Sequence, residues 1–166
     1  MASDLELRRF VPQRWEALEN LLMASGFDLD PTPRDPNEWR ADPPLGLIRI
    51  KALWVPHADT DPDANPDERV SIQLTERWST DDVPGALSER GLWLASYSYN
   101  GHIDGSNLRY DFDPLGHPES PSHRHPFNAP EGTRRPCDQV PPATVIKELL
   151  AVVADQIDSG RLPLTR

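Results

Sequence analysis

The chain lacks the groups that would tie a small protein together covalently. Cys137 is the only cysteine among 166 residues, which excludes an internal disulfide and any multi-thiolate zinc site. No run approaches the roughly 20 apolar residues of a membrane helix, and the segment from Met1 to Glu6 lacks the basic and apolar regions of a signal peptide. We therefore expect a cytoplasmic protein without membrane association that is stabilised by packing.

Basic residues are scarce as well. Seventeen Lys and Arg stand against 27 Asp and Glu, for a net charge of -10, which opposes non-specific binding to DNA or to an anionic membrane. Residues 105–140 are the exception, because four arginines nearly balance five acidic residues there and three of the five histidines fall in the same window. An anion can approach this window most easily, although a loop-rich segment also collects polar residues of every kind without any function.

Proline, in contrast to cysteine and the basic residues, is abundant. There are 19 prolines, the apolar share is 37%, and the mean hydropathy is -0.62, so much of the chain must be loop. The proline-rich segments 28–44, 57–68 and 113–142 are predicted to be surface loops, and the last contains eight prolines. Segment 57–68 is acidic but lacks the central glycine and the later glutamate of a calcium loop, so we interpret it as a solvated turn.

Two amphipathic stretches predict helices. In residues 11–25, Pro12 suits the first turn and Gly26 the exit; in residues 143–159, a proline pair and Gly160 mark the ends. The apolar stripes are Val11, Trp15, Leu18 and Leu22 in the first, and Ile146, Leu149, Leu150, Val153 and Ile157 in the second.

About four strands are expected between these helices, at residues 47–55, 70–75, 92–99 and 108–112. The last two predict an antiparallel hairpin, since Asn100-Gly101 and Asp104-Gly105 accept the positive φ angles of tight turns. Trp93, Ala95, Tyr97 and Tyr99 are expected on one face of the first strand; Leu108, Tyr110 and Phe112 on one face of the second, with Arg109, Asp111 and Asp113 opposite. One domain of 166 residues follows, an α+β fold with an antiparallel sheet covered on one face by an N-terminal and a C-terminal helix.

The histidines of the 113–142 segment are the best candidates for chemistry. If residues 122–126 are extended, His123 and His125 project to the same side and Arg124 points away. Two neighbouring imidazoles supply the acid and the base of proton-transfer catalysis without a cofactor. With Arg109 or Arg124 to stabilise a phosphate, these are the ingredients of a metal-independent ribonuclease.

Two other interpretations stand beside it. His123 and His125, together with His117 or Asp111, have the donor atoms for zinc, nickel or manganese and would leave a position open for water. Alternatively, the chain is a non-catalytic module whose acidic loops bind a basic partner protein. Cys137 lacks the surroundings that lower a thiol pKa, so we expect it to be inert.

Short motifs in residues 92–127 resemble a known family. Tyr97-Ser98-Tyr99, Leu108-Arg109-Tyr110-Asp111 and His123-Arg124-His125-Pro126 are similar to the core signature of the TumE-like proteins, toxin components of bacterial toxin–antitoxin systems. The resemblance implies an α+β toxin acting on RNA or translation and inhibited by a cognate antitoxin. The matching positions are Arg109, Tyr110, Asp111, His123 and His125. We predict a catalytic role for Arg109, Asp111, His123 and His125, and substrate binding by Tyr110, His117 and Arg124.

Overall fold

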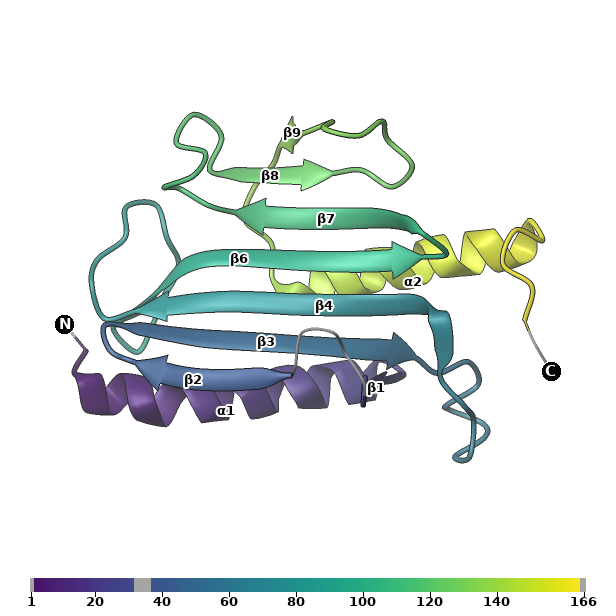
Figure 1. The fold of residues 1–166 in the computed structure, drawn as a ribbon, viewed down its shortest axis with the longest axis horizontal. Helices are drawn as coiled ribbons and strands as arrows, with labels where there is room; N and C mark the ends of the chain where they lie inside the picture. Colours follow the sequence, from purple (N-terminus) through teal and green to yellow (C-terminus); the bar gives the residue numbers. More distant parts are fainter. Residues whose placement is uncertain (1, 32–36, 165–166) are drawn as a thin grey trace.

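One antiparallel sheet, with both helices on the same side of it, organises the protein (Figure 1). The computed structural model describes residues 2–31 and 37–164. Its strands follow the order β1-β3-β4-β6-β7-β8-β9, while β2 also pairs with β3 and β5 with β6. Their bounds are β1 Phe27–Leu29, β2 Glu38–Asp42, β3 Leu45–Trp54, β4 Asp67–Ser79, β5 Ser88–Glu89, β6 Leu92–Ile103, β7 Ser106–Phe112, β8 Ser122–His125 and β9 Arg135–Pro136. The helices are α1 Asp4–Ala24 and α2 Pro142–Asp158.

The α+β class and the antiparallel sheet with a helix from each end of the sequence are confirmed, but the described residues form nine strands rather than about four. The additional strands arise largely within the proline-rich segments. Residues 28–44 contain β2 and most of β1, which pair with the two halves of β3 and satisfy backbone groups that would otherwise lie at the edge of the sheet. Residues 32–36 of that segment lie outside the described part.

The prediction that residues 113–142 form a surface loop is also wrong in part. This segment turns back after β7 and forms β8 along its edge, and β9 then pairs with β8. Pro121 and Pro126 bracket β8 and so do not remove a donor from its ladder. By contrast, residues 57–66 form the expected exposed turns, and the next strand begins at Asp67.

The sheet has a covered and an open face. Alternation along β3, β4 and β6 turns Ile50, Leu74 and Tyr99 toward the helices, where they are buried. Two glycines permit the close approach of the helices: an added Cβ at Gly46 would lie 2.5 Å from Val11 of α1, and one at Gly101 would lie 2.8 Å from Leu149 of α2. Among the described residues, no helix packs on the other face (Figure 1).

Helix α1 begins two turns earlier than predicted. Ser3 and Glu6 form a capping box, in which the Ser3 hydroxyl accepts from the backbone N–H of Glu6 and the Glu6 carboxylate accepts from that of Ser3. Pro12 therefore lies inside the helix, where its missing donor leaves the carbonyl of the exposed Arg8 to water. Helix α2 agrees with its prediction to within a residue at each end.

The predicted hairpin forms, with two corrections. Its turn is Asp104-Gly105, with φ angles of 48° and 86°, whereas Asn100-Gly101 continues β6 because Gly101 must pass beneath Leu149. A bulge at Ala95 then reverses the alternation, so Leu92 and Leu94 are buried and Trp93 lies on the other face from Tyr97. Leu108, Tyr110 and Phe112 share the covered face as expected, and Arg109 and Asp111 lie opposite them.

No helix in the described part of the chain is both long and apolar enough to cross a membrane.

Candidate functional site

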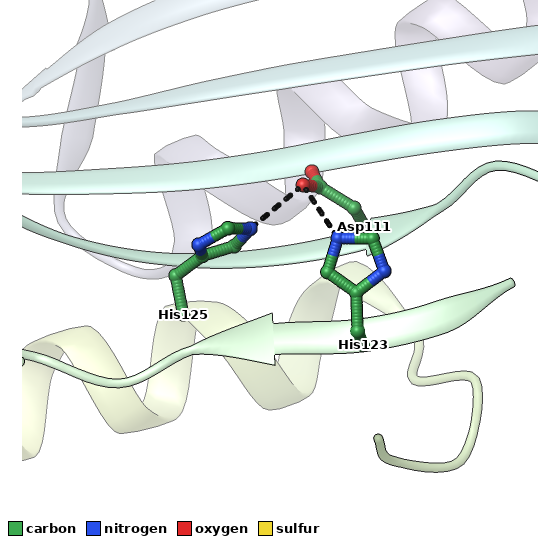
Figure 2. A group of neighbouring side chains, drawn as sticks. All are labelled: Asp111, His123 and His125. Carbon is green, nitrogen blue, oxygen red and sulfur yellow. Dashed lines mark ion pairs between the residues drawn. The ribbon is translucent and has the colours of Figure 1, made fainter. Parts of the chain in front are cut away.

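The candidate site lies on the open face where β8 runs beside β7. The antiparallel register sets Asp111 opposite His123 and Arg109 opposite His125. Because residues two apart on a strand share a face, both imidazoles meet the Asp111 carboxylate (Figure 2). The 113–142 segment thus folds back and brings together the four residues predicted as catalytic.

Three ligand atoms converge on one small volume. Nε2 of His123 lies 3.5 Å and Nε2 of His125 3.4 Å from Oδ2 of Asp111. All three atoms are within 4.8 Å of one another, and these residues form the one such group found in the described part of the chain. His123 is 1% exposed, and the side chains of Asp111 and His125 are 14% and 15% exposed. The cluster is therefore largely shielded from water.

Hydrogen bonds determine which ring nitrogens carry hydrogen. Nδ1 of His123 is 3.1 Å from the carbonyl oxygen of Ser120, which can only accept, so Nδ1 is the donor. When its ring is neutral, His123 therefore points a bare Nε2 at the carboxylate. Arg109 donates to Nε2 of His125 at 2.9 Å, so this nitrogen is an acceptor too. Burial, and then the charge of Arg109, lower the pKa of His125, which favours its neutral form.

Arg109 and Asp111 form the charged part of the site. Nε of Arg109 donates to Oδ2 of Asp111 at 2.8 Å. The other oxygen, Oδ1, is buried and has no hydrogen-bond partner among the described residues. A buried carboxylate oxygen without a donor is costly, so this side chain is left incompletely satisfied.

The other predicted residues are more scattered. His117 stays near the cluster: its ring meets that of His123 edge-on at 5.1 Å between centroids, and its Nδ1 accepts from Arg134 at 3.3 Å. Tyr110 lies on the covered face, where its hydroxyl donates to Glu148 of α2. Arg124 interacts there with Tyr110 and thus points away from His123 and His125, as expected. Tyr110 and Arg124 are therefore not brought to the histidines.

A pocket of about 470 Å³ adjoins the cluster on the open face. Arg109 and Asp111 line one side of it, and Arg77, Ser96 and Ser98 extend it across β4 and β6. We did not predict these last three residues as part of a site. The only signal was that Arg77 alternates with the apolar positions of its strand, which places it on the open face.

The lone cysteine takes no part in this site. Burial raises the pKa of the Cys137 thiol, which confirms that its surroundings do not lower it.

Comparisons of the chain with family models, curated proteins and solved structures found no match. The resemblance to TumE-like proteins thus stays a prediction, and the geometry of the open face carries the functional interpretation.

Proposed function

We propose that Asp111, His123 and His125 bind one divalent transition-metal ion and that the protein uses it to activate water. The observation that carries this proposal is the convergence of two imidazole nitrogens on one carboxylate oxygen, at 3.5 and 3.4 Å. Ligand atoms of a tetrahedral zinc ion with bonds of about 2.0–2.1 Å lie about 3.3–3.4 Å apart. The two nitrogen–oxygen separations match this spacing, and the two imidazole nitrogens, within 4.8 Å of each other, complete the ligand set when the rings turn toward one ion.

The electrostatics of the cluster call for a cation. When the ring of His123 is neutral, its hydrogen is on Nδ1, so Nε2 presents a lone pair to an anionic oxygen. Two lone pairs facing each other in a shielded site repel, and a metal ion between them converts this repulsion into coordination. His125 offers a second neutral nitrogen to the same ion.

The surroundings resemble the outer shell of a metal site. A metal-bound imidazole usually donates its second N–H to a carbonyl or a carboxylate, which holds the ring in place. The bond from His123 to the carbonyl of Ser120 does this. The free Oδ1 of Asp111 supplies a further donor atom for bidentate coordination. Three protein ligands leave a position for water, as in catalytic zinc sites.

Arg109 counterbalances the cluster when no ion is bound. Its guanidinium donates to both Asp111 and His125, and an ion that coordinates His125 must take the place of the second bond. The Arg109 side chain is 34% exposed and borders pockets on both of its sides, so it has room to turn away.

The test is direct metal binding by protein without a histidine tag. Chelator-treated protein is loaded with Zn²⁺, dialysed and analysed for metal content, and the affinity is measured by calorimetry. We expect one ion per chain, lost in His123→Ala and in Asp111→Asn. His102→Ala is the matched control, because His102 lies on the same face, on β6, outside the cluster. Equal zinc content in all four proteins, or none in the unmodified one, would refute the proposal, provided that circular dichroism shows each variant folded.

A second candidate function uses the same residues without a metal. In this proposal the chain is a TumE-like toxin that cleaves RNA by acid–base chemistry at His123 and His125 and is inhibited by an antitoxin protein. The contact of Arg109 with both Asp111 and His125 supports it, since a guanidinium so placed can stabilise a phosphate in the transition state. RNA cleavage that persists in excess chelator and disappears in His125→Ala would favour it over the metal proposal. Absence of cleavage under all conditions would remove it.

A further inference from the structure

The pocket beside the cluster contains an arginine without an evident structural role. Arg77 is exposed, lines the pocket, and forms no hydrogen bond or ion pair with any residue in the described ranges 2–31 and 37–164. Several other arginines of the sheet have acidic partners, for example Arg49 with Glu38 and Arg69 with Asp67. An unpaired arginine is notable in a chain with 27 acidic residues against 17 basic ones.

The register places Arg77 within reach of the proposed metal ion. Arg77 pairs with Ser96, and Ser98 pairs with Asp111, so β6 separates Arg77 from the cluster. Two strand spacings of about 4.8 Å and one two-residue step of about 7 Å set the Cα atoms of Arg77 and Asp111 about 12 Å apart. Both side chains line the same pocket, which leaves room between them for a small group.

The floor and the charges of this pocket suit an anion. Ser96 and Ser98 are small and carry hydroxyl donors. The positive charges of Arg77 and Arg109 offset the negative charges of Asp111 and Asp113, so a bound divalent ion makes the pocket positive. The planar guanidinium of Arg77 can donate two parallel hydrogen bonds to a phosphate or a carboxylate.

We propose that this pocket is the substrate subsite and that Arg77 binds an oxyanion of the substrate, a phosphate or a carboxylate, beside the metal ion. The inference rests on the proposed metal site. Leu45 and Leu115, which are 48% and 92% exposed, border the pocket and contact the apolar part of the substrate. The substrate is therefore a small amphipathic anion.

The experiment uses the zinc-loaded protein with two probes, inorganic phosphate and acetate, whose affinities are measured by calorimetry. The probe that binds more tightly identifies the oxyanion. We expect Arg77→Ala to weaken its binding at least tenfold and Arg77→Lys to weaken it less, with the zinc content unchanged in both. Arg40→Ala is the control, because Arg40 is an exposed arginine of β2 that pairs with Leu47 on the open face.

The outcomes separate the two proposals. If the protein binds zinc but neither probe, or if Arg77→Ala binds the probe as well as the unmodified protein does, the subsite is refuted and the metal site stands. If the protein takes up no zinc, the metal site is refuted and the subsite falls with it.

Discussion

Glu76 on the covered face and Asp111 on the open face are both carboxylates of central strands, yet their surroundings differ. Each oxygen of Glu76 accepts two hydrogen bonds: Oε1 from Arg14 and Tyr99, Oε2 from Arg14 and Trp78, at 2.7 to 2.9 Å. Asp111 receives one hydrogen bond, from Arg109, and faces two imidazole nitrogens at longer distances. Its Oδ1 has no partner in the described structure.

The difference separates a structural carboxylate from a candidate ligand. The four donors around Glu76, which is fully buried, tie helix α1 to the sheet and leave no vacancy for a further cation. The pKa of Arg14 is raised: burial opposes the shift, but the hydrogen bonds to Glu76 outweigh it. Asp111 retains unused acceptor capacity in a place that is reached from a pocket. A carboxylate with a structural role has all its oxygens hydrogen-bonded, whereas one that binds a ligand keeps an oxygen free to accept.

The largest effect is expected from Glu76→Ala. Removal of this side chain leaves the guanidinium of Arg14 mostly buried without its counterion, which costs about 3–5 kcal/mol of unfolding free energy. Denaturant unfolding followed by tryptophan fluorescence measures the loss. Asp111→Ala is the comparison, and we expect it to cost less because its cluster is incompletely satisfied. A larger loss for Asp111→Ala would contradict the distinction drawn between the two carboxylates.

The packing of the covered face is tested by Gly101→Ala. The new Cβ would lie 2.8 Å from a terminal carbon of Leu149, so the helix or this side chain must shift, at a cost of about 1–3 kcal/mol. Asn100→Ala, the neighbouring substitution on the open face, should change the thermal midpoint little. If both variants melt alike, the helix does not pack on Gly101 as described.

The open face is tested by Arg109→Gln. Glutamine removes the positive charge next to the proposed ion, and the bond from Arg109 to His125 no longer has to be broken. We therefore expect zinc affinity to rise about tenfold, which corresponds to about 1.4 kcal/mol. Calorimetry with chelator-treated protein measures the change. An affinity that falls instead would show that Arg109 supports the ligands rather than competing with the ion.

The smallest effect is expected from Arg161→Ala. Arg161 pairs with Asp155 at 3.7 Å, but the two side chains are 61% and 73% exposed. Water and salt screen such a pair, so its loss should change the unfolding free energy by less than about 0.5 kcal/mol. A loss of unfolding free energy comparable to that of Glu76→Ala would mean that burial does not determine how much an ion pair contributes to stability.

The buried network could have been suspected from the sequence. Val70, Ile72 and Leu74 set the apolar phase of β4, and Glu76 continues that phase before Trp78. A charged residue at an apolar position of a strand predicts a buried, paired carboxylate. Its partner Arg14 lies 62 residues away in the sequence, on helix α1, and local sequence patterns do not indicate which distant residue will pair with Glu76.

Other features could not be predicted locally. The bulge at Ala95 reverses the faces of β6 without a glycine or proline to signal it. The strands within the proline-rich segments form because neighbouring strands offer free backbone hydrogen-bonding groups. These segments are short and have low strand propensity, so their own residues do not predict such pairing.

The sequence alone determined the two helices and the central strands, since these depend on the spacing of apolar residues. It offered Asn100-Gly101 and Asp104-Gly105 for the hairpin turn, and the packing of Gly101 against Leu149 decided in favour of the second. The sequence also determined that His123 and His125 share one side of an extended segment. Only the tertiary structure decided that β8 pairs with β7 in the register that sets His123 opposite Asp111. Strand pairing is a long-range choice, and a slip of one residue would have turned both imidazoles to the other face of the sheet.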